Sequence, residues 1–280
     1  MSVTNPEADT RAGAPRVRGS FRRPFLLLFA LGMVGVLALY PALGPTAEMV
    51  AAQPGAPEMR LPLLQALLLV NPTILLLIAV AVGTLLAPRL GLRSYLAESA
   101  RGARGGLPAL RSELPWAIAL GAVAALLILV LDVAFRPWLP EEFLARAAEQ
   151  PRTLALTLAG MLYGGVTEEL IVRWGLLSLL AGSLWRLVQR GEGRPAGWIM
   201  WSAIVVAAVV FGAGHLGAVA AMAPLTGALI TRTIVLNALG GVVFGWLFWR
   251  KSLEAAMIAH ATGHVVFTLA AVAGTLLQST

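Results

Sequence analysis

Two glutamates and one arginine interrupt an otherwise apolar run that reads YGGVTEELIVRWGLL, residues 163–177. Side chains four residues apart lie on one face of an α-helix, so Glu169 and Arg173 have the spacing of a stabilising ion pair. Glu168 is five residues from Arg173 and is poorly placed to share its charge. We therefore expect Arg173 to neutralise and orient Glu169. Glu168 then remains available as a general base, which takes a proton from water during hydrolysis.

The three histidines of the chain lie in two other apolar runs, further along the sequence. His215 follows Phe211 by four residues in FGAGH, and His260 and His264 are four residues apart in HATGH. Two histidines at this spacing can share one metal ion or one water molecule. Glycines flank these positions, and small residues let membrane helices approach closely. We expect the glutamates and histidines of three helices to meet in one site, provided that the helices are tilted or broken or that the limits of the spans are shifted.

A purely structural role is the alternative for each of these groups. A buried Glu–Arg pair can lock helices together, and a single membrane histidine can be a packing residue. A charged side chain at membrane depth costs about 2.5–3.5 kcal/mol on insertion scales, so a second, uncompensated glutamate would be pure cost. The combination of Glu168 with three histidines therefore favours a functional site.

The composition indicates that these residues lie in a membrane. Hydrophobic residues make up 58% of the 280-residue chain and charged residues only 12%, against roughly 25% charged in soluble domains. The net charge is +7, but the basic residues lie at the ends of apolar runs and form no patch with interleaved aromatics, which excludes a nucleic-acid partner. The chain has no cysteine, so any metal ion would need His, Asp or Glu ligands.

Seven apolar runs are long enough to cross a bilayer, which takes about 20 residues in a helix. They cover roughly residues 24–43, 62–87, 115–135, 153–181, 197–216, 225–249 and 252–277. We predict an all-α, polytopic membrane helix bundle with about seven (six to eight) transmembrane helices. The first run is longer than the apolar part of a signal peptide, which favours a retained span. Residues 88–114 form the longest internal loop, either an interfacial helix or a flexible linker.

The charges predict an orientation and a division of the chain. Arginines gather in alternate loops, and cytoplasmic loops carry the Lys/Arg excess, so we expect a cytoplasmic N-terminus. The bias toward Ala, Gly and Arg, with a single lysine, indicates a bacterial protein of the inner (plasma) membrane. We expect a disordered basic arm at 1–23, N-terminal transmembrane helices and loops at 24–149, and a catalytic transmembrane core at 150–277.

Three motifs give the sequence a family resemblance. EELIVR at 168–173 matches the EExxxR motif of the CPBP family, the CAAX-protease and bacteriocin-processing membrane proteins, also called the Abi family. FGAGH at 211–215 matches its FxxxH motif, and HATGH at 260–264 lies where a third motif, His-x-x-x-Asn or Asp, is expected. The three motifs occur in order, each inside an apolar run. The chain therefore resembles this family over about residues 150–270.

The resemblance implies a membrane-embedded endopeptidase that hydrolyses a peptide bond of a membrane-associated substrate. Glu168 corresponds to the glutamate that activates water, Glu169 and Arg173 to the supporting pair, and His215 and His260 to the two motif histidines. Eukaryotic relatives cleave prenylated CaaX tails, and bacterial members are linked to bacteriocin maturation or self-immunity. The expected partners are thus a membrane-associated peptide or protein and the lipid bilayer.

His264 departs from the family pattern, which has Asn or Asp there. A histidine can donate a hydrogen bond to an oxyanion, as Asn would, or bind a metal. His215, His260 and His264 together with one carboxylate are compatible with catalytic zinc. A metal-free glutamate mechanism is also argued for the family, and the sequence leaves both open.

Two other classes of function compete with the endopeptidase. A non-catalytic membrane immunity or scaffold protein could keep the same polar cluster. His264 would then be a substitution that accumulated after the active site had lost its function. A transporter or proton relay also uses Glu and His in membrane spans. A relay does not need the Glu-Glu-x-x-x-Arg spacing, and the inverted repeats common in transporters are not apparent. The endopeptidase is therefore our leading hypothesis.

Overall fold

A computed structural model describes residues 21–53, 55, 58–149 and 153–278. All but the last three residues of the predicted basic arm, 1–23, lie outside these ranges. Within them the chain forms helices and no strands, and seven helical segments are long and apolar enough to cross a membrane. The segments are Arg22–Ala51, Leu61–Leu90, Pro108–Trp138, Leu154–Gln189, Gly197–Ala220, Gly227–Arg250 and Leu253–Leu277. The predicted all-α, seven-span membrane bundle is therefore confirmed.

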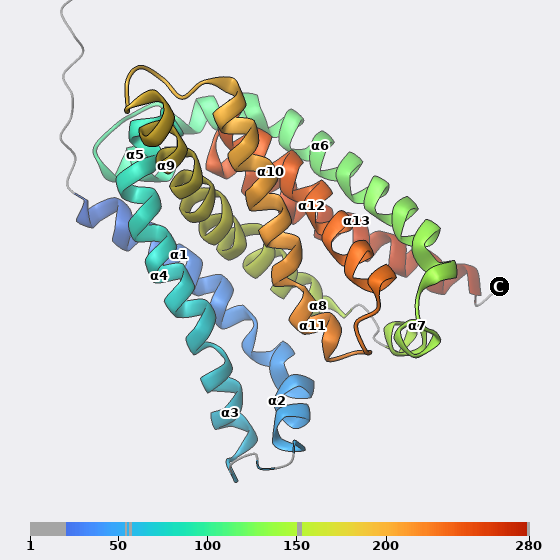
Figure 1. Ribbon diagram of the computed structural model, residues 1–280. Coiled ribbons are helices and arrows are strands. Elements are labelled where there is room, and N and C mark those ends of the chain that lie inside the picture. Colours follow the sequence, from blue (N-terminus) through green and yellow to red (C-terminus); the bar gives the residue numbers. More distant parts are fainter. Residues whose placement is uncertain (1–20, 54, 56–57, 150–152, 279–280) are drawn as a thin grey trace, which may run out of the picture.

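Several spans are built from consecutive helical elements (Figure 1). The elements are α1 (Arg22–Ala38), η1 (Tyr40–Leu43), α2 (Gly44–Ala51), α3 (Leu61–Leu68), α4 (Val70–Leu86), η2 (Ala87–Leu90), α5 (Tyr95–Ala100), α6 (Gly106–Phe135), η3 (Arg136–Trp138), α7 (Glu141–Ala148), α8 (Leu154–Ala159), η4 (Gly160–Glu168), η5 (Leu170–Leu177), α9 (Ser178–Gln189), α10 (Gly197–Gly214), α11 (Leu216–Ala220), α12 (Gly227–Arg250) and α13 (Leu253–Gln278).

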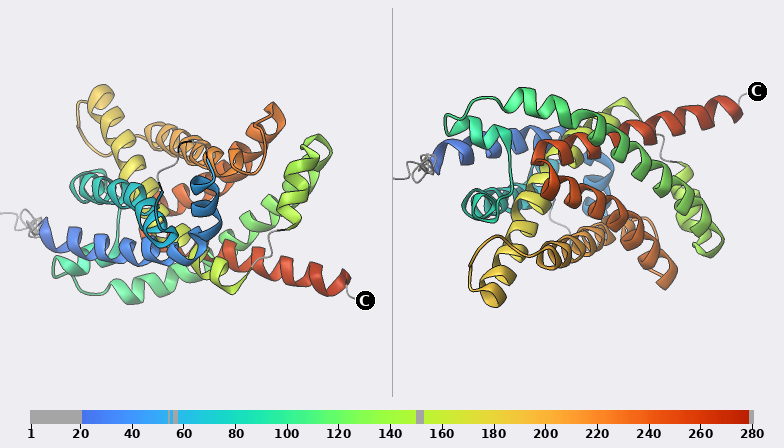
Figure 2. Two further views of the ribbon diagram at one scale, coloured as in Figure 1. Left: turned by 90° about the horizontal axis from the view of Figure 1, so that it is seen from below. Right: turned by 90° about the horizontal axis from the view of Figure 1, so that it is seen from above.

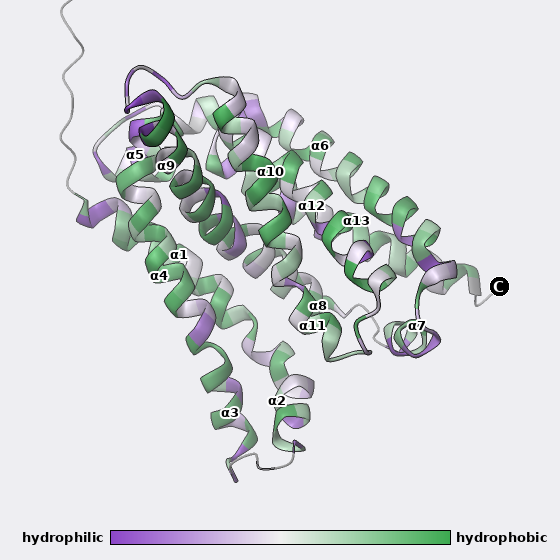
Figure 3. Ribbon diagram, in the orientation of Figure 1, coloured by the Kyte–Doolittle hydropathy of each residue, from purple (hydrophilic) through white to green (hydrophobic). Residues whose placement is uncertain are grey.

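The fourth span, η4 with η5 and its flanking helices, is the centre of the bundle. It packs against α1, α4, α10, α12 and α13, and the two end-on views of Figure 2 show these helices around it. Half of its apolar window is buried (50%), against 39% or less for the other spans. Outward faces elsewhere are mostly apolar, with hydrophilic residues gathered toward the end near α5 and the α9–α10 connection (Figure 3). This distribution fits a bundle surrounded by lipid.

The centre of the fourth span is π-helical rather than α-helical. In η4 and η5 the backbone N–H groups donate to carbonyls five residues back instead of four. Such π-helical segments are rare in proteins, and where they occur they are often at functional sites. The α-helical geometry assumed from the sequence is therefore wrong for this segment. Gly165 packs directly on α13, where an added Cβ would lie 3.0–3.2 Å from Ala261. The wider helix and its glycines bring the motif residues of the two spans together.

The fifth span changes its hydrogen bonding at His215. α10 ends at Gly214, and α11 continues for five residues after His215. The backbone of His215 keeps helical angles, φ −84° and ψ −11°, but its N–H donates to the carbonyl of Gly212, three residues back. The junction is therefore one tight turn within a span that runs from Gly197 to Ala220.

The segment predicted as a long loop, 88–114, is shorter and more ordered than expected. It contains α5, and α6 begins at Gly106 instead of 115. The predicted span began only after Glu113, because a charged residue interrupts the apolar run. The structure buries the Glu113 side chain, which accepts hydrogen bonds from Tyr95 and Ser252. Most buried apolar residues from Leu28 to Ala259 form one hydrophobic cluster, and Leu139, Phe143, Ala223 and Leu229 form a second, smaller one. The division at 149/150 stays a prediction.

Candidate active site

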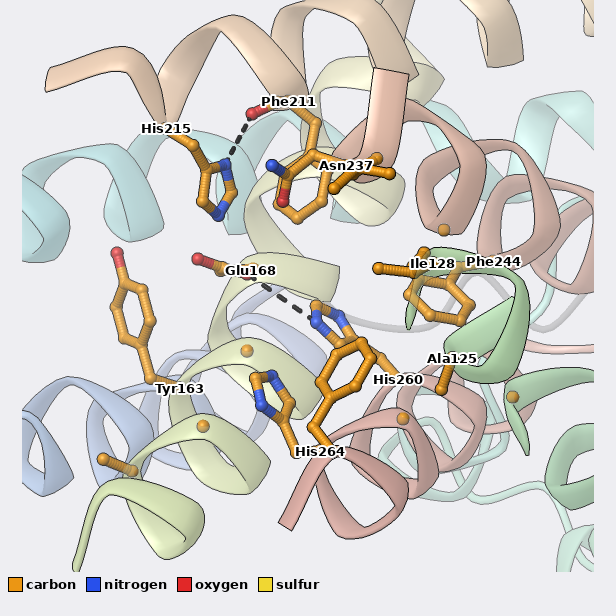
Figure 4. Close-up of a pocket in the computed structure, with 18 of the residues that line it drawn as sticks. Ala125, Ile128, Tyr163, Glu168, Phe211, His215, Asn237, Phe244, His260 and His264 are labelled. Atoms are coloured by element: carbon orange, nitrogen blue, oxygen red, sulfur yellow. Dashed lines mark hydrogen bonds and ion pairs between the residues drawn. The ribbon is translucent and has the colours of Figure 1, made fainter. Parts of the chain in front are cut away.

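A cavity of about 370 Å³ lies between the fourth span and α6, α10, α12 and α13. The side chains of Glu168, His215, His260 and His264 all line it (Figure 4). Glu169 and Arg173 lie behind its wall, 0% and 1% exposed. The structure thus brings all six sequence-predicted site residues together, four at the cavity surface and two as buried support.

The buried support is an ion pair between neighbouring turns of the central helix. Arg173 Nη1 lies 3.1 Å from Glu169 Oε1, as the sequence predicted. Arg173 Nη2 also donates to the carbonyl of Gly241 at 3.3 Å. The guanidinium lies over the rings of Phe211 and Phe244, at 4.8 and 5.4 Å from their centres, which stabilises its charge away from water.

This pair sets the orientation and the tautomer of His260. The Nδ1 atom of His260 lies 2.8 Å from Glu169 Oε1, and a carboxylate held by an arginine accepts, so Nδ1 carries the hydrogen and donates it. The Nε2 atom of neutral His260 is then an acceptor. It faces Glu168, whose Oε2 lies 3.9 Å away, too far for a direct hydrogen bond (Figure 4). One bridging water fits a separation of this size.

His215 enters the cavity from the opposite wall. Its Nδ1 donates to the carbonyl of Phe211 at 2.8 Å, which fixes the ring. Its Nε2 is therefore an acceptor when the ring is neutral. Figure 4 shows the imidazole facing Glu168 across the cavity from His264. The acidic group thus lies among three imidazoles.

His264 belongs to a stack of three rings, with His260 of α13 and Phe244 of α12. The Phe244 and His260 rings stack at 4.7 Å, and those of His260 and His264 at 5.1 Å. Two glycines of the central helix face His264, since a Cβ at Gly160 or Gly164 would come within 2.5 Å of a ring nitrogen. The imidazole therefore fits where the family has a smaller Asn or Asp because glycines stand opposite it.

The three imidazoles do not converge in the manner of a zinc site. The rings of His260 and His264 are nearly parallel, 14° apart, so their in-plane lone pairs point alongside each other rather than at one point. Zinc ligands converge from about 2.0–2.1 Å. The described residues contain no group of three or more His, Asp or Glu side chains arranged to hold a metal. Zinc binding by these histidines stays a prediction.

Sequence reasoning missed two features of the site. Tyr163 lines the cavity five residues before Glu168, and the five-residue repeat of a π-helix is the signal that would have grouped them. A second, largely apolar cavity of about 410 Å³ lies between α4, η5 and α10. It shares Tyr163, Glu168, Phe211 and His215 with the first. Glu168 thus stands where the two cavities adjoin.

Comparison with known proteins agrees with the motifs. Residues 150–266 match the family model described as type II CAAX prenyl endopeptidase, Rce1-like. The match confirms the resemblance inferred from the three motifs and, with the seven apolar helices, indicates an integral membrane endopeptidase. No curated protein and no solved structure matches the chain.

Proposed function

We propose that this protein, whose residues 150–266 match the Rce1-like CAAX endopeptidases, hydrolyses a peptide bond with a water activated by Glu168. One observation carries the proposal: Glu168 faces His260 across 3.9 Å, and His260 is oriented by a buried Glu169–Arg173 pair. Glu168 Oε2 and His260 Nε2 are both acceptors, so together they can hold both hydrogens of one water. The oxygen lone pairs of that water are then left for attack on a carbonyl carbon.

The proton balance follows from this geometry. As the water oxygen attacks, Glu168 takes one proton, and the carbonyl becomes a tetrahedral oxyanion. Glu168 then returns the proton to the leaving amine as the C–N bond breaks. The Glu169–Arg173 pair keeps its charges throughout and holds His260 in one tautomer, the role an acid plays behind the histidine of a hydrolase triad.

The oxyanion needs hydrogen-bond donors, and His260 is an unsuitable one. The hydrogen of its neutral ring is directed at Glu169, so its cavity-facing Nε2 cannot donate. His260 is therefore not the donor to the oxyanion. We assign that role to His264 and to the phenol of Tyr163, which line the same cavity. His215 accepts through Nε2 and orients the N–H of the leaving amine.

The adjoining apolar cavity supports a membrane-associated substrate. Its lining includes Leu75, Ile78 and Val210, outward-facing residues of α4 and α10. A hydrocarbon group such as the prenyl chain of a CaaX tail could lie there with the peptide bond at Glu168.

We further propose a bacterial plasma-membrane protein with a cytoplasmic N-terminus. Single cysteines introduced at Glu58 and Glu192 of this cysteine-free chain test it: an impermeant maleimide added outside the cell should label the first and spare the second.

The decisive test is cleavage of membrane-tethered peptides, prenylated and unprenylated, by purified protein in detergent. Glu168→Gln should lower kcat by about 10²–10⁴-fold, the usual contribution of a general base. Glu142→Gln is the matched control, because Glu142 is a half-exposed partner of Arg146 away from the cavity. Equal cleavage by parent and Glu168→Gln would overturn the mechanism. Biological activity that survives Glu168→Gln would favour a non-catalytic immunity or scaffold role instead.

A further inference from the structure

A hollow of about 390 Å³ lies at the end of the bundle where three connections meet. They are the segment between η2 and α5, the α9–α10 connection and the short turn between α12 and α13. Each contributes at least one cation to the lining. The cations are Arg93, Arg194, Arg250 and Lys251. We call this hollow the basic cleft.

The positive charge of the basic cleft is largely uncompensated. No acidic residue lines it. Among the described residues, the only ion pair formed by these four cations joins Arg93 to Glu98 at 3.0 Å, and that pair is half-exposed. Repulsion among the cations makes the cleft unfavourable when empty and attractive to an anion.

The backbone holds the cations in place. The N–H of Leu253 donates to the carbonyl of Arg93 at 3.0 Å, which ties the η2–α5 segment to the start of α13. Gly91 turns the chain with a left-handed φ of 74° and approaches the guanidinium of Arg194, since an added Cβ would lie 4.0 Å from it. Arginines and lysines that serve only to set the orientation of the protein in the membrane need to lie on the cytoplasmic side. That role does not require cations from three separate connections to surround one hollow.

Tryptophans around the basic cleft indicate its depth in the membrane. Trp249 lines it and packs edge-on against Trp201 at 5.9 Å. Arg250 lies over the ring of Trp249 at 5.3 Å, and Lys251 over that of Trp116 at 5.9 Å. Trp116 and Trp201 are 56% and 43% exposed. Exposed tryptophans of membrane helices sit at the headgroup level, so the cleft opens where lipid headgroups lie.

We propose that the basic cleft binds the phosphate headgroup of an anionic phospholipid, with the acyl chains lying along the apolar outer face of the bundle. Arginine forks pair well with phosphate, and basic pockets between membrane helices bind anionic headgroups. The position at headgroup level favours a bilayer lipid over a soluble phosphate. The bound lipid would hold the turn from which α13, the helix of His260 and His264, begins.

Thermal unfolding in detergent, with phosphatidylglycerol or phosphatidylcholine added, tests this site. The variant is Arg194→Gln/Arg250→Gln/Lys251→Gln. The matched control, Arg89→Gln/Arg186→Gln/Arg190→Gln, removes the same charge from a neighbouring hollow. Phosphatidylglycerol should raise the Tm of the parent and the control, while the cleft variant should lose most of that shift. Phosphatidylcholine should have little effect.

Three results would overturn the proposal. They are an unchanged phosphatidylglycerol shift in the cleft variant, an equal loss of the shift in the control, and an equal shift with inorganic phosphate alone. If the triple variant does not fold, Arg194→Gln serves in its place, because Arg194 is an exposed loop residue. Native mass spectrometry of the parent should show a retained anionic lipid that Arg194→Gln reduces. None of these readouts depends on peptidase activity.

Discussion

The bundle contains two pairs of buried or half-buried glutamates, and their surroundings differ in kind. Glu254 at the start of α13 accepts from Ser94 Oγ at 2.7 Å and from the backbone N–H groups of Tyr95 and Leu96 at 3.1 and 3.0 Å. Glu113 accepts from the hydroxyls of Tyr95 and Ser252. All of these donors are neutral and fixed. This pair joins α5, α6 and α13 into one unit.

The pair in the centre of the membrane is satisfied only in part. Glu169 offers one oxygen to both Arg173 and His260, while its Oε2 has no hydrogen-bond partner among the described residues. Glu168 faces His260 without a direct hydrogen bond. Both glutamates have ionisable neighbours. A carboxylate saturated by neutral donors stabilises a fold, whereas one left partly unsatisfied beside ionisable groups can bind water and move protons.

The largest effect should come from removing Glu169. Glu169→Ala leaves Arg173 as an unpaired buried charge and should lower the free energy of unfolding by about 3–5 kcal/mol. It should also abolish cleavage, because His260 loses its orienting acceptor. Denaturant unfolding in detergent measures the first effect. A double variant, Glu169→Ala/Arg173→Met, should regain stability without activity. Regained activity would show that the pair only locks helices together.

Removing the phenol oxygen of Tyr163 should separate catalysis from stability. Tyr163→Phe should lower kcat by about 10²–10³-fold, as the loss of one oxyanion donor does, with KM and Tm nearly unchanged. Tyr95→Phe is the matched control, since its hydroxyl bonds to Glu113 at 2.8 Å. It should lower Tm and spare kcat. The same result for both tyrosines would contradict the contrast between the two glutamate pairs.

Glu254 should show the opposite behaviour to Glu168. Glu254→Ala leaves two buried donors and the partly buried N–H of Leu96 without their acceptor and should lower the free energy of unfolding by about 1–3 kcal/mol. The folded fraction should retain the parental kcat. Circular dichroism melting together with cleavage assays checks both. A large loss of kcat at full folding would place Glu254 in the catalytic machinery.

The smallest expected effect concerns the fit of His264. Gly164→Ala places a methyl group about 2.5 Å from its Nε2 and should cost roughly 1–3 kcal/mol of strain. The loss of stability should shrink in Gly164→Ala/His264→Asn, because Asn is shorter. Melting temperatures of the single and double variants measure the coupling. Strictly additive effects would mean that the glycine and the histidine are not matched.

The sequence predicted the membrane fold and the central pair of glutamates for clear physical reasons. Long apolar runs define spans by themselves, and a charge within such a run stands out. The pairing of Glu169 with Arg173 was also predicted, although the helix is π rather than α. Backbone winding depends on how η4 packs against α13, which local sequence does not specify.

The saturated pair was not predictable in the same way. Glu113 and Glu254 lie at the ends of spans, where charges are ordinary. Their partners are up to 160 residues away in the sequence. The tautomer of His260 likewise follows from a contact 91 residues distant. Motifs therefore identified which residues meet, while the direction of each hydrogen depended on the fold.

The fourth span is longer than the hydrocarbon core that it crosses. Its 36 residues from Leu154 to Gln189 would rise about 54 Å at the α-helical 1.5 Å per residue, against a core of roughly 30 Å. A span of this excess length tilts or thickens the bilayer around it. The helix that carries Glu168 must therefore tilt within the bilayer or extend into the headgroup region.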